Sequence, residues 1–124
     1  QFFKGLLADE AKGIFQGTLF VDKNASQTNA NQLNKNLLLS ETATAITQPQ
    51  LQIDTDDVKC AHGATVSQIR QDEIFYLQSR GLSKSHAIQL LSLAFAKDIL
   101  DQHYDNEADL HHLNHISTFI GATQ

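Results

Sequence analysis

The chain has 124 residues and a formal net charge of −5 at pH 7, with 41% hydrophobic and 19% charged residues. This composition excludes a wholly disordered chain and fits one domain or a compact pair of layers. Because the balance is acidic and the lysines and arginines are scattered singly, we expect neither nucleic acid nor a membrane surface as a partner.

Residues 12–70 are predicted to form strands and turns. Short apolar segments at residues 18–21, 37–39, 51–53 and 58–60 are separated by stretches rich in Asn, Ser and Thr, which favour turns. The last two segments alternate apolar and polar residues, as a half-buried strand does. The single proline, Pro49, is expected in a turn before the strand at residue 51, where it removes no hydrogen-bond donor from a sheet.

The spacing of the apolar segments predicts a solenoid. Leu19, Leu38 and Val58 follow one another at nearly equal steps, and the segments at 43–46 and 64–66 keep a similar step. Repetition at about 20 residues is typical of successive coils that stack their apolar residues on one another. A β-sandwich is the alternative that this degenerate repeat leaves open.

Residues 71–120 change to a helical period. A first helix is expected to begin at Asp72 and to end at Arg80 and Gly81, and Ser83 is the predicted N-cap of a second. The apolar stripe of the second helix, interpreted as a core face, comprises Ala87, Leu90, Leu91, Ala94, Phe95 and Leu100. A third, shorter helix is predicted at residues 110–120. We therefore expect β-solenoid coils over residues 1–70 and a helical subdomain over residues 71–124.

Cys60 and His62 form the one local constellation that suggests chemistry. Residues two apart in a strand point to the same face, and thiolate and imidazole groups are ligands for iron and other soft-to-borderline metals. Two ligands are too few for a structural zinc site, so a metal there needs ligands from other residues or another subunit. The structural alternative is a buried cysteine beside a hydrogen-bonded histidine.

His111 and His115 have the i,i+4 spacing of a helical metal-chelating pair. Because the sequence indicates no third ligand, we prefer to interpret this region as a solvated polar face. The other polar residues of the tail, interpreted as surface groups, are Asp101, His103, Asp105 and His112. The chain also lacks a GxxxxGK[ST] phosphate-binding loop, a GxGxxG turn and a CxxC pair, so no common catalytic motif is present.

The cellular compartment follows from the cysteine content and from the absence of targeting features. Cys60 is the only cysteine and forms no internal disulfide, which fits a reducing compartment. No apolar stretch approaches the roughly 20 residues of a membrane span, and the N-terminus lacks the pattern of a signal peptide. We expect a cytoplasmic protein and, because the sequence contains no Met, residues that precede Gln1.

Four segments of the chain resemble the SufB/SufD family, in the same order. They are NLLLS at residues 36–40, PQLQI at 49–53, VKCAHGATV at 58–66 and FYLQSRGL at 75–82, and the resemblance extends over residues 13–101. Two positions favour the SufD branch. Gly63 follows His62 where SufB-type chains carry a glutamate, and Asn34 stands where they carry a cysteine.

The resemblance implies a right-handed parallel β-helix followed by helices, and a non-enzymatic scaffold role in SUF iron–sulfur cluster assembly. It implies two partners, a SufC-type ATPase bound through the helical region and a SufB-type scaffold paired through the end of the β-helix. Cys60 and His62 would then be metal ligands near the SufB contact. No tightly bound cofactor is implied, only iron or a transient cluster in the complex.

An open β-helix end leaves strand edges exposed, so we expect the chain in isolation to form a homodimer. Two alternatives to the scaffold function remain. One is a purely structural dimerisation module without a metal role. The other is a β-helix enzyme acting on polysaccharides, for which Asp54, Asp56 and Asp57 form the nearest acidic cluster, although a solvated turn is the simpler interpretation.

Overall fold

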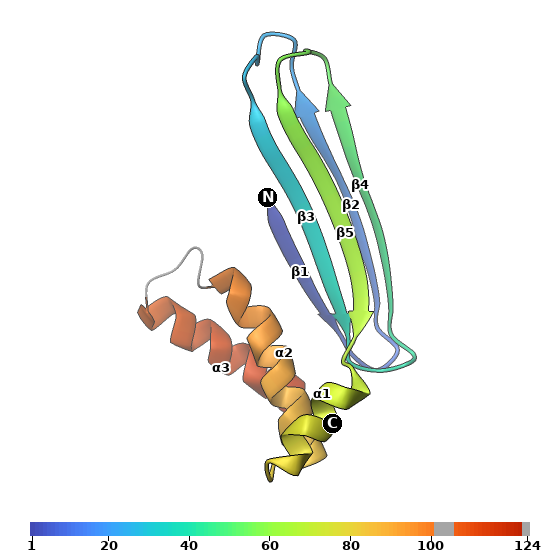
Figure 1. Ribbon diagram of the computed structural model, residues 1–124, viewed down its shortest axis with the longest axis vertical. Helices are drawn as coiled ribbons and strands as arrows, with labels where there is room; N and C mark the ends of the chain where they lie inside the picture. Colours follow the sequence, from blue (N-terminus) through green and yellow to red (C-terminus); the bar gives the residue numbers. More distant parts are fainter. Residues whose placement is uncertain (101–105, 123–124) are drawn as a thin grey trace.

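Five strands and three helices form the part of the chain that the computed structural model describes, residues 1–100 and 106–122 (Figure 1). The strands are β1 (Phe2–Leu7), β2 (Lys12–Val21), β3 (Asn29–Leu38), β4 (Thr44–Ile53) and β5 (Lys59–Gln68). The helices are α1 (Gln71–Ser79), α2 (Lys84–Leu100) and α3 (Asn106–Ala122). Strands therefore give way to helices close to residue 70, where the sequence period changes.

The strands form two sheets, and every pairing within them is parallel. One sheet has the order β1-β3-β5 and the other the order β2-β4. Each connection carries the chain from one sheet to the other, and the strands of the two sheets run in opposite directions (Figure 1). Sheet membership thus alternates as it does in a flattened parallel β-helix. The mainly β class with a helical C-terminal part is confirmed, and the right-handed sense of the coil stays a prediction.

The step of the repeat is longer than the spacing of the apolar segments predicted. Phe2 pairs with Leu33, Lys12 with Thr44 and Asn29 with Lys59, so one complete repeat spans about 30 residues. Leu19 pairs with Leu51, and Leu38 with Gln68, so the series Leu19, Leu38 and Val58 was wrong as a stacking register. The physical reason is that one repeat contains two strands and two turns. The shorter step therefore compares positions that do not stack: Leu19 and Leu38 lie in opposite sheets, and Val58 lies in the turn before β5.

Pro49 lies inside β4, paired with Gly17, and not in the turn expected from the sequence. The N–H groups of Thr44 and Asp54 donate to carbonyls on the β2 side. Because successive residues of a strand direct their N–H groups to opposite edges, the even-numbered residues of β4 face β2 and position 49 faces away. At this outer edge the missing proline donor removes no ladder hydrogen bond.

The space between the two sheets holds polar as well as apolar side chains. The rings of Phe3 and Phe15 lie 4.8 Å apart across the sheets, and the Gln32 side-chain nitrogen lies 3.0 Å from where a Cβ on Gly17 would stand. The alternate residues of β3 that begin with Gln32 therefore face the second sheet. Gln32, Asn34 and Asn36 are 1%, 3% and 8% exposed, so this core contains a polar layer.

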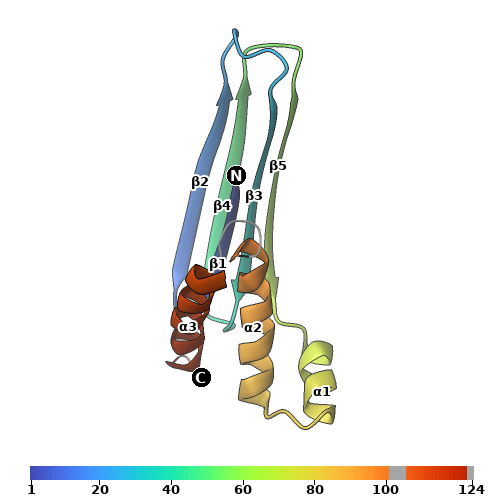
Figure 2. The same ribbon diagram turned by 90° about the vertical axis from the view of Figure 1, so that its left-hand side faces the viewer.

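The helices gather at one end of the sheets, with α2 beside β1 (Figure 2). The N-terminus of α2 is capped as predicted, since the His86 N–H donates to Ser83 Oγ at 3.2 Å. The end of α1 is also as predicted. Gly81 has φ +96°, and the Leu82 N–H donates back to the Leu77 carbonyl at 3.2 Å, a Schellman motif. Contacts join the strands and the helices, so the division into two domains stays a prediction.

Candidate functional site

Cys60 and His62 both lie on β5, on the face that is turned toward the second sheet. Cys60 pairs with Ala30, and His62 pairs with the inward-facing Gln32. Parallel partners share a face, so the thiol and the imidazole point the same way, as the sequence predicts. Cys60 is partly buried and His62 is exposed, because β5 is the last strand in its sheet.

The backbone of the same two residues faces the open edge of the sheet. The Lys59 N–H donates to the Thr28 carbonyl at 2.8 Å, on the β3 side. N–H groups alternate between the two edges of a strand, so those of Cys60 and His62 point away from β3. No strand among residues 1–100 lies beyond β5. The edge of β5 therefore has no neighbouring strand among residues 1–100, and Cys60 and His62 lie along it.

Gln32 is a site residue that sequence reasoning missed. Its side-chain Nε2 donates to Gln1 Oε1 at 2.9 Å, while its buried Oε1 has no hydrogen-bond partner among the described residues. The register places it beside His62. The alternation Gln32-x-Asn34-x-Asn36 was the available signal, but only the pairing register shows that Gln32 and not Asn34 is the neighbour of His62.

Asn34, where the resemblance contrasts this chain with SufB, lies on β3 and pairs with Ala64. It is buried between the sheets and accepts a hydrogen bond of 2.7 Å from Asn36 Nδ2. It therefore lies two residues further along the ladder than the Gln32–His62 pair. The Asn34 amide belongs to the polar layer, and its oxygen already accepts the hydrogen bond from Asn36.

The histidine tail is separate from the strand site. His111 and His115 lie on α3 with ring centroids 4.7 Å apart, and His112 lies 5.8 Å from His111. All three are exposed, which agrees with a solvated polar face. The side chains of Asp101, His103 and Asp105 fall outside the described residues. Where the structure describes the chain, no group of three or more His, Cys, Asp or Glu side chains is placed to hold a metal ion.

The acidic cluster Asp54, Asp56 and Asp57 lies in the turn between β4 and β5, and all three residues are exposed. The Asp57 carbonyl accepts a 2.6 Å hydrogen bond from the Gln27 N–H of the turn between β2 and β3. Successive turns of the same end are therefore stacked and hydrogen bonded through backbone. This placement agrees with the interpretation of the cluster as a solvated turn.

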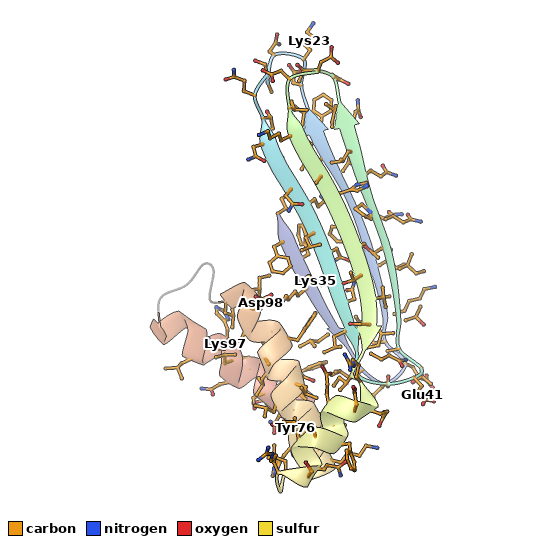
Figure 3. The ribbon with its side chains drawn as sticks, viewed as in Figure 1. Lys23, Lys35, Glu41, Tyr76, Lys97 and Asp98 are labelled. Atoms are coloured by element: carbon orange, nitrogen blue, oxygen red, sulfur yellow. The ribbon has the colours of Figure 1, made fainter. Side chains whose placement is uncertain are left out.

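An apolar groove of about 510 Å³ runs between α1 and α2. Phe75 and Tyr76 of α1 are 73% and 57% exposed, and Leu90 of α2 is 48% exposed. Tyr76 lies at the helical end of the molecule (Figure 3). The Arg80 guanidinium lies over its ring, 5.4 Å from the ring centre. The residues that line the groove are Asp72, Glu73, Tyr76, Leu77, Leu90, Leu91 and Ala94.

Comparison with known proteins identifies the family. The family described as "SUF system FeS cluster assembly, SufBD core domain" matches residues 1–95, which is most of the chain and includes all five strands. The chain belongs to the SufBD family. The resemblance noted for residues 36–82 is thereby confirmed.

Three relatives of this SufBD chain place it in the family more closely. It is 51% identical to the iron-sulfur cluster assembly SufBD family protein slr0076 of Synechocystis, over 82% of this chain and 22% of the relative. It is 41% identical to the Escherichia coli iron-sulfur cluster assembly protein SufD, over 82% and 24%. It is 37% identical to the chloroplastic protein ABCI7 of Arabidopsis thaliana, over 97% and 26%. The SufD branch is confirmed, and the SufBD chain spans about a quarter of the length of these relatives.

α3 lies beyond the residues that the family description matches, which end at residue 95 within α2. The site on β5 lies well inside the matched part. None of the described helices has the length and apolar character that crossing a membrane requires.

Proposed function

We propose that this chain is part of a scaffold subunit in SUF iron–sulfur cluster assembly, a non-enzymatic protein that pairs with a SufB-type scaffold and binds a SufC-type ATPase. The observation that carries the proposal is the position of Cys60 and His62 at the open edge of β5, inside the segment that matches the SufBD core. Iron, and any cluster built from it, is the substrate of the assembled complex.

The edge formed by β5, with the adjoining edge of β4, is the proposed contact for the SufB-type partner. Unpaired N–H and C=O groups of an edge strand bind a strand from another chain, which satisfies them without further folding. Ile53 of β4 and Val66 of β5, at 39% and 44% exposure, add apolar area along this edge. A partner strand laid along β5 would bring its own side chains next to Cys60 and His62 and supply the ligands that this chain lacks.

The groove between α1 and α2 is the proposed contact for the ATPase. Its exposed apolar residues Tyr76 and Leu90 have the character of aromatic and aliphatic anchors in protein interfaces. One wall of the groove, α2, also contacts β1, so a force applied at the groove reaches the sheets. Nucleotide-driven dimerisation of the ATPase would then shift the edge at which His62 lies.

Substitution of His62 tests the role of the imidazole. In a reconstituted complex, His62→Ala is expected to lower the cluster yield while the far-UV circular dichroism and the melting temperature stay unchanged, because His62 is exposed. His86→Ala, at another exposed histidine, is the matched control and should leave the yield intact. An unchanged yield with His62→Ala would favour the purely structural dimerisation module.

Cys60 is proposed as a second ligand or a helper to His62. Anaerobic titration of the protein with Fe²⁺, with and without the partner, is expected to show binding that falls in Cys60→Ser and in His62→Ala. Binding that needs the partner would support a site shared between subunits. Equal binding by the wild type and both variants would contradict a metal role for these residues.

In isolation the same exposed edge is expected to produce a homodimer through β5. Size-exclusion chromatography with light scattering at micromolar concentration is the measurement, and a stable monomer would contradict the expectation. The single free Cys60 fits a reducing compartment. We propose the cytoplasm, although the name of the matched relative ABCI7 places that protein in the chloroplast.

A further inference from the structure

His111 and His115 lie one helical turn apart on α3, which packs beside α2 (Figure 2). The packed face of α3 is marked by Ser117, whose Oγ accepts a 2.9 Å hydrogen bond from Gln89 Nε2 of α2, and by the fully buried Ile120. Both histidines are exposed. Because residues four apart on a helix lie on the same face, the two imidazoles form one exposed pair.

The distance between the two rings is that of imidazoles that share one metal ion. The ring centres of His111 and His115 lie 4.7 Å apart. A zinc ion lies about 2.1 Å from a coordinating imidazole nitrogen, and hence about 3.2 Å from the ring centre. Two imidazoles that meet at one ion at an angle of about 90–109° therefore have centres about 4.5–5.2 Å apart. The observed spacing falls within this range, so binding requires rotation of the side chains and no movement of the helix.

Two imidazoles define the class of metal ion that this pair selects. Neutral imidazole binds zinc, nickel and copper ions, and binds Fe²⁺ more weakly than these, whereas Ca²⁺ and Mg²⁺ prefer oxygen ligands. Among the residues that the structure describes, no third His, Cys, Asp or Glu joins the pair. The remaining coordination positions are therefore open to water, as in an exchangeable site and unlike a closed structural one.

We propose that His111 and His115 form a two-imidazole chelate for a divalent transition-metal ion of the zinc, nickel and copper class. The ion joins successive turns of α3, and it stabilises the helix because the two ligands are brought together only in the helical state. The site uses neither Cys60 nor His62, and it lies beyond residues 1–95 that the family description matches. The inference therefore does not rest on the proposed function.

Calorimetric titration with Zn²⁺ tests the chelate. Cys60→Ser serves as the parent protein, because the thiol at the β5 edge would compete for zinc. We expect saturable binding of one zinc ion by the parent. His111→Gln and His115→Gln should each weaken that binding by at least about tenfold, because the second imidazole of a chelate acts at the high effective concentration of a tethered group. Both positions are exposed, so the variants should fold as the parent does.

His112→Gln is the matched control on the same helix. The His112 ring lies 5.8 Å from that of His111, outside the range for a shared ion, so this variant should bind zinc as the parent does. Hydrogen exchange of the α3 amides gives a second readout. Zinc should slow it in the parent and leave it unchanged in His115→Gln. No saturable binding by the parent, an equal loss in His112→Gln, or zinc binding without slower exchange in α3 would each overturn the proposal.

Discussion

Lys4 of β1 and Asp98 of α2 form an ion pair with 2.6 Å between Nζ and Oδ2, although 94 residues separate them in the sequence. Lys4 also donates to the Phe95 carbonyl at 2.5 Å, and its ammonium lies 4.5 Å from the centre of the Phe95 ring. Its side chain is only 6% exposed, whereas that of Asp98 is 54% exposed. One lysine thus ties the sheet to the last turns of α2, and Figure 3 shows Asp98 at this junction.

Lys4→Met is expected to weaken this junction. Methionine keeps much of the apolar stem but donates neither hydrogen bond, and the loss of hydrogen bonds to a charged group and to a carbonyl costs roughly 1–3 kcal/mol of unfolding free energy. Urea unfolding followed by circular dichroism is the measurement. Lys12→Met, at an exposed lysine, is the control and should change the unfolding free energy far less. Equal effects of the two substitutions would argue against the junction.

Asp98→Asn should change how stability depends on pH. The hydrogen bond and the charge of Lys4 hold the pKa of the Asp98 carboxyl below its ordinary value of 3.8, and Lys35 contributes in the same direction. A lowered folded-state pKa stabilises the fold above the unfolded-state pKa, and this stabilisation is lost as the pH falls through the folded-state value.

The difference in unfolding free energy between the wild type and Asp98→Asn is therefore expected to be complete near pH 6, about two units above the ordinary carboxyl pKa, and to shrink as the pH falls below 3.8. Because the Asp98 side chain is 54% exposed, added salt should also reduce the difference at neutral pH. A difference that stays constant down to acid pH would show that the carboxylate charge contributes nothing.

Gly81→Ala should destabilise the end of α1. Gly81 has φ +96°, and an added Cβ would meet no atom within 4 Å, so the cost comes from the backbone conformation and amounts to about 1 kcal/mol. Gly121→Ala is the matched control. That glycine also has open space around it but lies in α3 with no positive φ. Alanine at this position should therefore stabilise the helix slightly. Thermal melts compare the two, and a loss of similar size at both positions would contradict the argument.

Ile120→Ala should loosen the packing of α3 on α2. Ile120 is fully buried, and truncation of a buried isoleucine to alanine costs about 2–5 kcal/mol. Its neighbour Phe119 is 47% exposed, so Phe119→Ala should cost much less although more atoms are removed. Hydrogen exchange of the α3 amides is the measurement that locates the effect. Faster exchange in Phe119→Ala than in Ile120→Ala would show that the opposite face of α3 is packed.

Local features of the helices were predictable from the sequence. The Ser83 cap and the Gly81 stop depend on residues within one turn of each other, and the structure shows both. Strand positions were predictable only in part. Apolar segments such as 51–53 were found, but β4 and β5 extend through polar stretches that the pattern does not distinguish from turns.

The common face of Cys60 and His62 was predicted, and their surroundings were missed. The alternation of a strand placed Cys60 and His62 on one face, because that relationship needs only two neighbouring positions. The step of the repeat was wrong, and with it any expectation of what lies beside His62. The Lys4–Asp98 pair has no local signal, and the alternation from Gln32 to Asn36 does not show which residue lies beside His62, since both relationships join residues that are distant in the sequence.

The sequence by itself determined the change from strands to helices near residue 70, the helix caps, the common face of Cys60 and His62, and the resemblance to the SufB/SufD family, whereas β1 (Phe2–Leu7) was not predicted. These features depend on short-range periodicity and on the chemistry of adjacent residues. Only the tertiary structure decided the register of the longer repeat, the open edge of β5 and the neighbours of His62. The physical reason is that parallel pairing fixes which distant residues meet, and turn lengths set that pairing without leaving a repeat in the residue types.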